Sequence, residues 1–237
     1  MYSSLVLAVI ALWPTQDPTW RDIVQPGFKD LSFVGTVLQA DSRELKKISS
    51  DFAASYRLLN DDVSAKLKEP FMIRMEAHVE DTNVLFVENG TRRLFKVPNI
   101  SKVENVSSAP GKRQSLLDFG ILTPSLFESL FDAKFVRQDR ESGDWVFDLT
   151  YKEPSFDDTS RQRIWVDNQK HYTTKRMWFA QDGHQMATFL YQSPVLQNGV
   201  WIPSKVVVKN VDDRVAGITE YKSVRVNTGL SDQPFHF

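Results

Sequence analysis

Residues 84–97 read VLFVENGTRRLFKV, and this stretch shows the pattern that most of the chain repeats. Val84 to Glu88 and Arg92 to Val97 are rich in residues that favour strands, and Asn89-Gly90 lies between them. An Asn-Gly pair between two such runs is the strongest short signal of a β-hairpin, because both residues tolerate positive φ angles. The stretch therefore predicts two antiparallel strands joined by a tight turn.

Alternation of apolar and polar residues also marks the run that precedes this hairpin. Phe71, Ile73 and Met75 fall on one face of a predicted strand, and Met72 and Arg74 fall on the other. We expect the Phe71 face to be the concave one. An error of one residue would exchange the two faces, because successive side chains of a strand point to opposite sides.

The second half of the chain continues the pattern, with turn pairs such as Asp182-Gly183 and Asn198-Gly199 between the runs. Further strands are predicted at Trp145–Tyr151, Gln162–Asp167, Tyr172–Phe179, Gln185–Tyr191, Val200–Val211 and Ile218–Val226. No helix regularly separates these runs, which excludes a parallel α/β fold. The predicted fold class is mainly β, with one antiparallel sheet of about ten or eleven strands that is strongly curved or partly closed.

Two helical regions are predicted beside the strands. Residues 14–50 are assigned to an N-terminal helical and connecting segment in which Asp41 caps a helix, and residues 51–237 to the main domain. An insertion at about 112–132 contains a short helix that starts at Thr123-Pro124. Its apolar residues are Leu116, Leu117, Phe119, Ile121, Leu122, Leu126, Phe127, Leu130 and Phe131. This apolar insertion lies between the two β-rich halves, where a lid over a curved sheet is expected.

The chain begins with an apolar run, Leu5 to Trp13. The run is too short to span a bilayer and has the length of a signal-peptide core, so residues 1–13 are predicted to direct export. A first buried strand is the alternative, because Met1 to Ser4 contains no Lys or Arg. No later run approaches the roughly 20 apolar residues of a membrane helix, and no stable membrane anchor is expected.

Composition and motif content exclude several functions. The 237 residues include 29 Lys and Arg against 30 Asp and Glu, a balance that provides no field for nucleic-acid binding. The sequence has no cysteine, which removes thiol chemistry and cysteine metal sites. The four histidines are scattered, and neither a glycine-rich phosphate loop nor a G-x-S-x-G motif is present. We therefore expect no enzyme, no metal site and no cofactor.

The order of these elements resembles the LolA-like superfamily of outer-membrane lipoprotein-sorting proteins, over roughly residues 52–237. The motifs that carry the resemblance are Lys66-Leu67-Lys68-Glu69-Pro70-Phe71, the hairpin strands at 85–98, Trp165-Val166-Asp167, Lys175-Arg176-Met177-Trp178-Phe179, Gly199-Val200-Trp201-Ile202-Pro203, and the closing residues Tyr221 to Phe235.

The resemblance implies an incomplete, half-open antiparallel β-barrel whose helices form a lid over a hydrophobic cavity. In the founding members, this cavity receives lipoprotein acyl chains from an inner-membrane transporter and carries them through the periplasm to an outer-membrane acceptor. That acceptor is anchored through an N-terminal cysteine, which this chain lacks. The resemblance therefore implies a periplasmic, monomeric carrier of lipoprotein acyl chains or a related lipid.

The residues expected to line the cavity belong to the lid and to the strand face assigned to its interior. They are Phe71, Ile73, Met75, Leu116, Leu117, Phe119, Leu122, Phe127, Leu130, Phe131, Trp145, Phe147 and Trp178. In the family, a basic residue before the proline of the opening strand helps to latch the lid. Glu69 occupies that position here, with Lys68 or Arg74 as candidate substitutes.

A different function on the same fold is the alternative: an envelope sensor or protein-interaction module without lipid transport. A large apolar cavity would favour a carrier, whereas a packed interior with an exposed apolar edge or patch would favour an interaction module.

Overall fold

The structure is a computed structural model that describes residues 16–58, 62–152 and 160–237. The predicted signal segment, residues 1–13, lies outside the described residues. Thirteen strands among these described residues dominate the fold. Those of the first half are β1 (Asp30–Ala40), β2 (Val63–Lys68), β3 (Met72–Val79), β4 (Thr82–Asn89), β5 (Arg92–Val97) and β6 (Ile100–Asn105). Those of the second half are β7 (Phe131–Gln138), β8 (Trp145–Tyr151), β9 (Arg161–Val166), β10 (Thr173–Phe179), β11 (Gln185–Gln197), β12 (Val200–Asn210) and β13 (Val215–Val226).

The helices are short. The α-helices are α1 (Ser42–Lys46), α2 (Ser50–Leu58) and α3 (Pro124–Ser129), and the 3-10 helices are η1 (Trp20–Asp22), η2 (Pro110–Lys112), η3 (Leu116–Phe119) and η4 (Gln233–Phe235). Among the described residues, none of the helices has the length and apolar character needed to cross a membrane.

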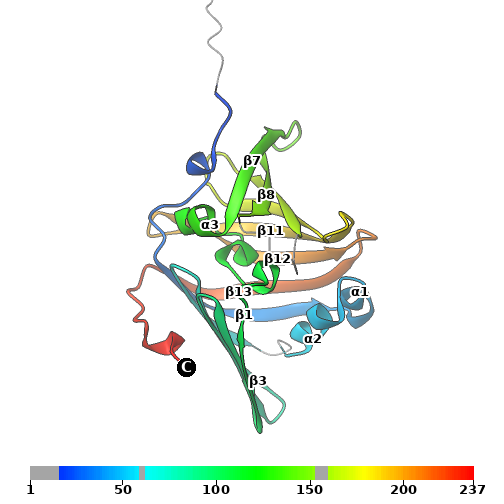
Figure 1. The fold of residues 1–237 in the computed structure, drawn as a ribbon, viewed down its shortest axis with the longest axis vertical. Coiled ribbons are helices and arrows are strands. Elements are labelled where there is room, and N and C mark those ends of the chain that lie inside the picture. The colour runs from blue at the N-terminus through cyan, green and yellow to red at the C-terminus, as the bar shows by residue number, and fades with distance from the viewer. Residues whose placement is uncertain (1–15, 59–61, 153–159) are drawn as a thin grey trace, which may run out of the picture.

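All the strands form one antiparallel sheet in the order β6-β5-β4-β3-β2-β1-β13-β12-β11-β10-β9-β8-β7. β6 and β7 lie at the two ends of this order, so the sheet is open between them. The sheet is curved and does not close into a barrel (Figure 1). The predicted fold class is therefore confirmed. The predicted hairpin is present as β4 and β5, in which Asn89 pairs with Arg92 and Gly90 has a φ of +64°.

The sheet has more strands than the ten or eleven expected. One of the additional strands lies in the N-terminal region, where only a helical and connecting segment was expected. Residues 14–50, assigned to a helical and connecting segment, contain β1, which pairs with both β2 and β13. The pattern was weak there because Gly35 interrupts the apolar face formed by Leu31, Phe33 and Val37. The helix predicted at Asp41–Ser50 is α1, and Asp41 caps it by accepting hydrogen bonds from the backbone of Arg43 and Glu44.

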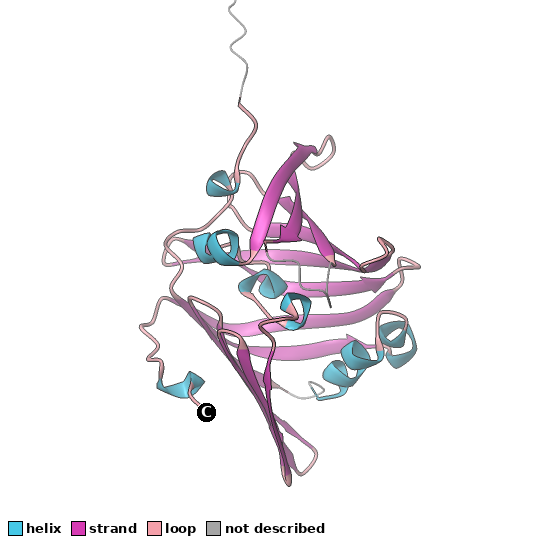
Figure 2. Ribbon diagram, in the orientation of Figure 1, coloured by secondary structure: helices cyan, strands magenta, loops and turns pink. Residues whose placement is uncertain are grey.

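The helices α1, α2 and α3 lie over the concave face of the sheet (Figure 2). α2 packs closely against β13, because a Cβ atom on Gly217 would lie 2.5 Å from Cε1 of Tyr56. The segment from η2 to α3 crosses the middle of the same face and corresponds to most of the insertion predicted at 112–132, although Phe131 begins β7 and does not extend the helix. Its role as a lid stays a prediction. The main apolar core lies between these helices and the sheet.

The C-terminal segment covers part of the outer face. Phe235 in η4 is fully buried against Val87 and Leu94, which point away from the main core. Asp30 holds the approach to η4, because its carboxylate accepts hydrogen bonds from the backbone N–H groups of Thr228 at 2.7 Å and Gly229 at 3.0 Å. The end of the chain is thus tied to the centre of the sheet.

Candidate functional site

All the residues predicted to line a cavity lie in one apolar cluster on the concave face. Most of them are buried, and Met75, Trp145 and Trp178 are partly buried and pack against the others. Ile73 is buried in this cluster, whereas Met72 packs against the outer cluster around Phe235. The concave face is therefore the one that the alternation indicated. Lipid binding by these residues stays a prediction.

The lid fills the space above the sheet. Leu117, Leu122 and Phe127 are at most 1% exposed, so the closed lid behaves as part of the core. Gly120 ends η3 with a φ of +76°, and a Cβ atom there would lie 2.8 Å from Cδ1 of Tyr191. Only glycine satisfies both the left-handed backbone and this close approach to β11. The lid is thus seated directly on the sheet.

A polar latch joins the lid to the sheet inside the apolar cluster. The guanidinium of Arg176 on β10 donates a hydrogen bond to the carboxylate of Asp118 in η3, at 2.7 Å. The same guanidinium lies 4.1 Å from the ring centroid of Phe189. The hydroxyl of Tyr191 donates to the carbonyl of Leu117 at 3.0 Å. Burial raises the pKa of Tyr191, so its hydroxyl stays protonated and remains a donor.

Lys68 and Arg74, the candidate substitutes for the basic latch residue, have other roles. The expectation that one of them latches the lid is therefore wrong. Lys68 forms an ion pair with Asp232, and Arg74 donates to the carbonyl of Pro234. Both therefore hold the C-terminal segment on the outer face and do not reach the lid, because their side chains alternate away from the concave face. Glu69 does contact the lid, since its carboxylate accepts a hydrogen bond from the hydroxyl of Ser125 in α3.

A buried carboxyl group lies beside the lid. Glu88 on β4 is 0% exposed, and the backbone N–H of Gln114 donates to its Oε2 atom at 3.3 Å. Its other oxygen, Oε1, is buried and has no hydrogen-bond partner. Burial raises the pKa of Glu88 to about 8, against lowering contributions from Gln114 and Arg113. The group is therefore mostly protonated at neutral pH.

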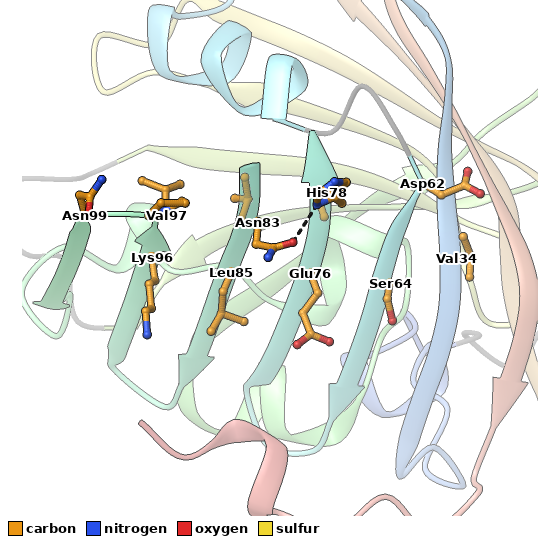
Figure 3. A pocket seen from close by; sticks show the side chains of 13 residues that line it. Val34, Asp62, Ser64, Glu76, His78, Asn83, Leu85, Lys96, Val97 and Asn99 are labelled. Carbon is orange, nitrogen blue, oxygen red and sulfur yellow. Dashed lines mark hydrogen bonds between the residues drawn. The ribbon is translucent and has the colours of Figure 1, made fainter. Parts of the chain in front are cut away.

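A wide groove of about 870 Å³ lies on the opposite side of the sheet (Figure 3). Cross-strand pairing places Ser64, Glu76, Leu85 and Lys96 in one row, and Leu85 packs against the outer cluster. In the groove, Nδ1 of His78 and Oδ1 of Asn83 are 2.8 Å apart (Figure 3). The groove is wide and open, and Asp62, Glu76 and Lys96 contribute charged groups to its lining. No cluster of potential metal ligands occurs among the described residues.

The polar latch was not predicted from the sequence, although one signal for it exists. Arg176 and Trp178 are two residues apart on one strand, so a prediction that places Trp178 on the concave face places Arg176 there too. Asp118 stands alone among the apolar residues of the lid, and an acid in such a segment needs a partner when it packs against a core.

Solved structures share this architecture. A LolA superfamily protein from Nitrosomonas europaea aligns over 92% of this chain and 94% of its own, with 12% identity and a TM-score of 0.62. A DUF1329 family protein from Desulfovibrio piger aligns over 89% and 90%, with 14% identity and a TM-score of 0.57. A domain from Vibrio parahaemolyticus, described as an outer-membrane lipoprotein-sorting protein domain, aligns over 92% and 93%, with 12% identity and a TM-score of 0.57.

These likenesses establish the class: the chain has the LolA-like fold, as its sequence motifs indicated. A family model described as "Uncharacterized protein" matches residues 68–237, and the chain belongs to that family. A comparison with curated protein sequences finds no match.

Proposed function

We propose that this protein is a non-enzymatic carrier of the bacterial periplasm that binds lipoprotein acyl chains, or a related lipid, beneath its lid. One observation carries the proposal: the apolar residues of the lid and those of the concave face form a single cluster. Outward movement of the lid would expose an apolar surface on both sides. An acyl chain could then take the place of Leu117, Leu122 and Phe127 against the sheet.

The energetics explain why such a carrier needs no catalytic residue. A 16-carbon chain has about 15 methylene groups, and exposing each to water costs about 0.8 kcal/mol, or on the order of 12 kcal/mol in all. Transfer through water is therefore very slow without protection. An empty carrier has the same difficulty with its own apolar surface, so a filled interior is the form expected without ligand.

The polar connections between lid and sheet are directional hydrogen bonds, which is compatible with a movable lid. They include the Arg176–Asp118 pair, the Tyr191 hydroxyl on the Leu117 carbonyl, and the backbone N–H of Thr173 on the carbonyl of Gly120 at 3.0 Å. Each is a contact that can break without unfolding a long helix, because η3 and α3 are only four and six residues long.

The solved structures that share this fold support a role in the cell envelope. Their printed descriptions name the LolA superfamily and outer-membrane lipoprotein sorting. For this chain we propose export, an inner-membrane donor transporter and an outer-membrane acceptor, with the carrier acting as a monomer. No nucleic acid, metal or cofactor takes part in the proposed transfer.

Native mass spectrometry and lipid extraction test the proposal, applied to protein purified from an envelope fraction beside the latch variant Asp118→Asn. We expect co-purifying lipid or acylated protein, and faster uptake of a fluorescent fatty acid by the variant. Leu196→Asp, a change at an exposed residue of β11, is the control and should behave as the parent protein. A parent protein that carries no lipid, with neither form taking up fatty acid, would eliminate the carrier function.

A second candidate function, an interaction module, is favoured by two observations: the interior beneath the lid is packed, and an apolar edge is exposed at β6. This strand is one end of the sheet, and Ile100 and Val103 on it are 60% and 52% exposed. An exposed apolar edge is a site at which another polypeptide can add a strand. Ile100→Lys together with Val103→Lys should abolish partner binding in this case and leave lipid uptake unchanged.

A further inference from the structure

A small pocket of about 200 Å³ lies where the two ends of the open sheet face the lid. Its lining residues are Thr91, Val106, Ser107, Pro110, Arg113, Ser129, Leu130 and Tyr151. The first five lie beside β5 and β6 or within and next to η2, whereas Ser129 and Leu130 lie at the end of α3 and Tyr151 ends β8. The pocket therefore joins residues from both sides of the gap between β6 and β7, and it has room for roughly six water molecules at about 30 Å³ each.

Arg113 supplies positive charge to this pocket. Its guanidinium lies 3.9 Å from the ring centroid of Phe71, which holds the side chain in place. Its Nε atom is buried and has no hydrogen-bond partner. Within the described part of the chain, its side chain makes no ion pair, whereas Arg93 pairs with Glu104 and Arg176 with Asp118. A guanidinium that lines a pocket and makes no ion pair among the described residues is suited to bind an anion with two oxygens in one plane.

Arg113 is the one charged residue among the described residues that line the pocket. Glu88 is the carboxyl group that interacts with Arg113 electrostatically, and burial raises the pKa of Glu88, which weakens its negative charge near neutral pH. Arg93 and Asp118, which also act on Glu88, are each engaged with a partner of opposite charge. The lining of the pocket therefore carries a positive charge from Arg113.

The other residues that line the pocket contribute either hydroxyl groups or apolar surface. Thr91, Ser107, Ser129 and Tyr151 contribute hydroxyl groups. Leu130 belongs to the main apolar cluster, as does Phe71 beneath Arg113. A ligand that fits this pocket therefore combines an oxyanion with an apolar part that continues toward the concave face.

We propose that the pocket at Arg113 binds the phosphate or carboxylate group of an anionic amphiphile whose acyl chain lies beneath the lid. This inference rests on the proposed carrier function and specifies its ligand class. It distinguishes amphiphiles with a charged head group from neutral ones with the same chain. Binding of a free phosphate compound at the same place is the other source of this chemistry, and the experiment separates the two.

The experiment compares 1-palmitoylglycerol 3-phosphate with 1-palmitoylglycerol, which differ only in the phosphate, together with glycerol 3-phosphate and inorganic phosphate. Binding to the full chain is measured by isothermal titration calorimetry below the micelle-forming concentration. The parent protein should bind the phosphorylated amphiphile about tenfold or more tightly than the neutral one. Arg113→Gln should bind the two equally, with its affinity for the neutral amphiphile unchanged.

Two further variants complete the design. Arg137→Gln is the control, because Arg137 is 52% exposed on β7, and it should retain the preference of the parent protein. Arg113→Lys keeps the charge but loses the planar fork, so the preference should fall without vanishing. If circular dichroism shows that Arg113→Gln does not fold, the binding preference is judged from Arg113→Lys instead.

Each remaining outcome also decides the proposal. A preference that persists in Arg113→Gln, or that is absent from the parent protein, overturns it. Binding of glycerol 3-phosphate or inorganic phosphate alone, lost in Arg113→Gln, supports the anion site and eliminates the carrier function. Absence of binding by all four compounds eliminates both.

Discussion

The carboxylate of Asp118 bridges the lid and the sheet: its Oδ1 atom accepts a hydrogen bond from Arg176 at 2.7 Å, and its Oδ2 atom accepts one from the backbone N–H of Ser115 at 2.8 Å. The first contact reaches β10, and the second closes the turn that begins η3. One side chain therefore sets both the local conformation of the lid and its attachment to the concave face.

Removal of the charge on Asp118 should loosen the lid. Asp118→Asn leaves Arg176, whose side chain is 8% exposed, without a charged partner, and we expect the free energy of unfolding to fall by about 2 kcal/mol or more. Amide exchange in residues 116–122 should accelerate. Asp132→Asn is the control, because that side chain is 67% exposed, and urea titration should show almost no change. Equal effects of the two substitutions would contradict a latch role for Asp118.

The buried Glu88 should make stability depend on pH. Its pKa of about 8 in the folded protein compares with 4.5 in the absence of burial, so between these values the folded protein holds a proton that the unfolded chain releases. The free energy of unfolding therefore falls as the pH rises through this window. Glu88→Gln cannot ionise, and it should match the parent protein at pH 4.5 and exceed it at pH 8 by on the order of 4 to 5 kcal/mol at most.

Urea titrations at these two pH values measure this difference. Glu220→Gln serves as the control, because the side chain of Glu220 is 42% exposed. Parallel profiles for the parent protein and Glu88→Gln would show that the Glu88 carboxyl titrates normally.

The contact between β13 and α2 leaves no space for a larger residue. Gly217→Ala brings a methyl group within 2.5 to 2.9 Å of three atoms of the Tyr56 side chain, so α2 must shift. We expect a loss of about 1 to 3 kcal/mol in the free energy of unfolding. Gly27→Ala is the matched control, because a Cβ atom there meets no atom within 4 Å. Circular dichroism during thermal unfolding should separate the two variants by several degrees, and identical transitions would refute the close approach.

The C-terminal segment should contribute strongly to stability through one side chain. Phe235 is fully buried in the outer cluster, and Phe235→Ala should lower the free energy of unfolding by about 3 to 5 kcal/mol. Phe237 lies two residues further on and is 39% exposed, so Phe237→Ala should have little effect. Limited proteolysis is expected to remove the C-terminal residues of the first variant and to spare those of the second. Resistance of both variants would mean that the segment is held mainly by its polar contacts with Asp30, Lys68 and Arg74.

The strand pattern and the turn residues allowed the fold class, the hairpin at Asn89-Gly90 and the lid to be predicted. β1 was missed, because Gly35 weakens the apolar face by which a strand is recognised. The family comparison also suggested a latch near Pro70. The charged latch instead joins Arg176 and Asp118, which are 58 positions apart along the chain.

The sequence by itself determined the antiparallel sheet, the interior face of Ile73 and Met75, and the apolar lid, because these follow from the alternation and turn chemistry of neighbouring residues. Only the tertiary structure decided which polar groups meet beneath the lid, where Arg113 and Glu88 lie at the gap between the ends of the sheet, and how the chain terminus closes the outer face. Such contacts depend on the curvature of the whole sheet and on the path of the lid across it, and no local pattern of residues specifies either.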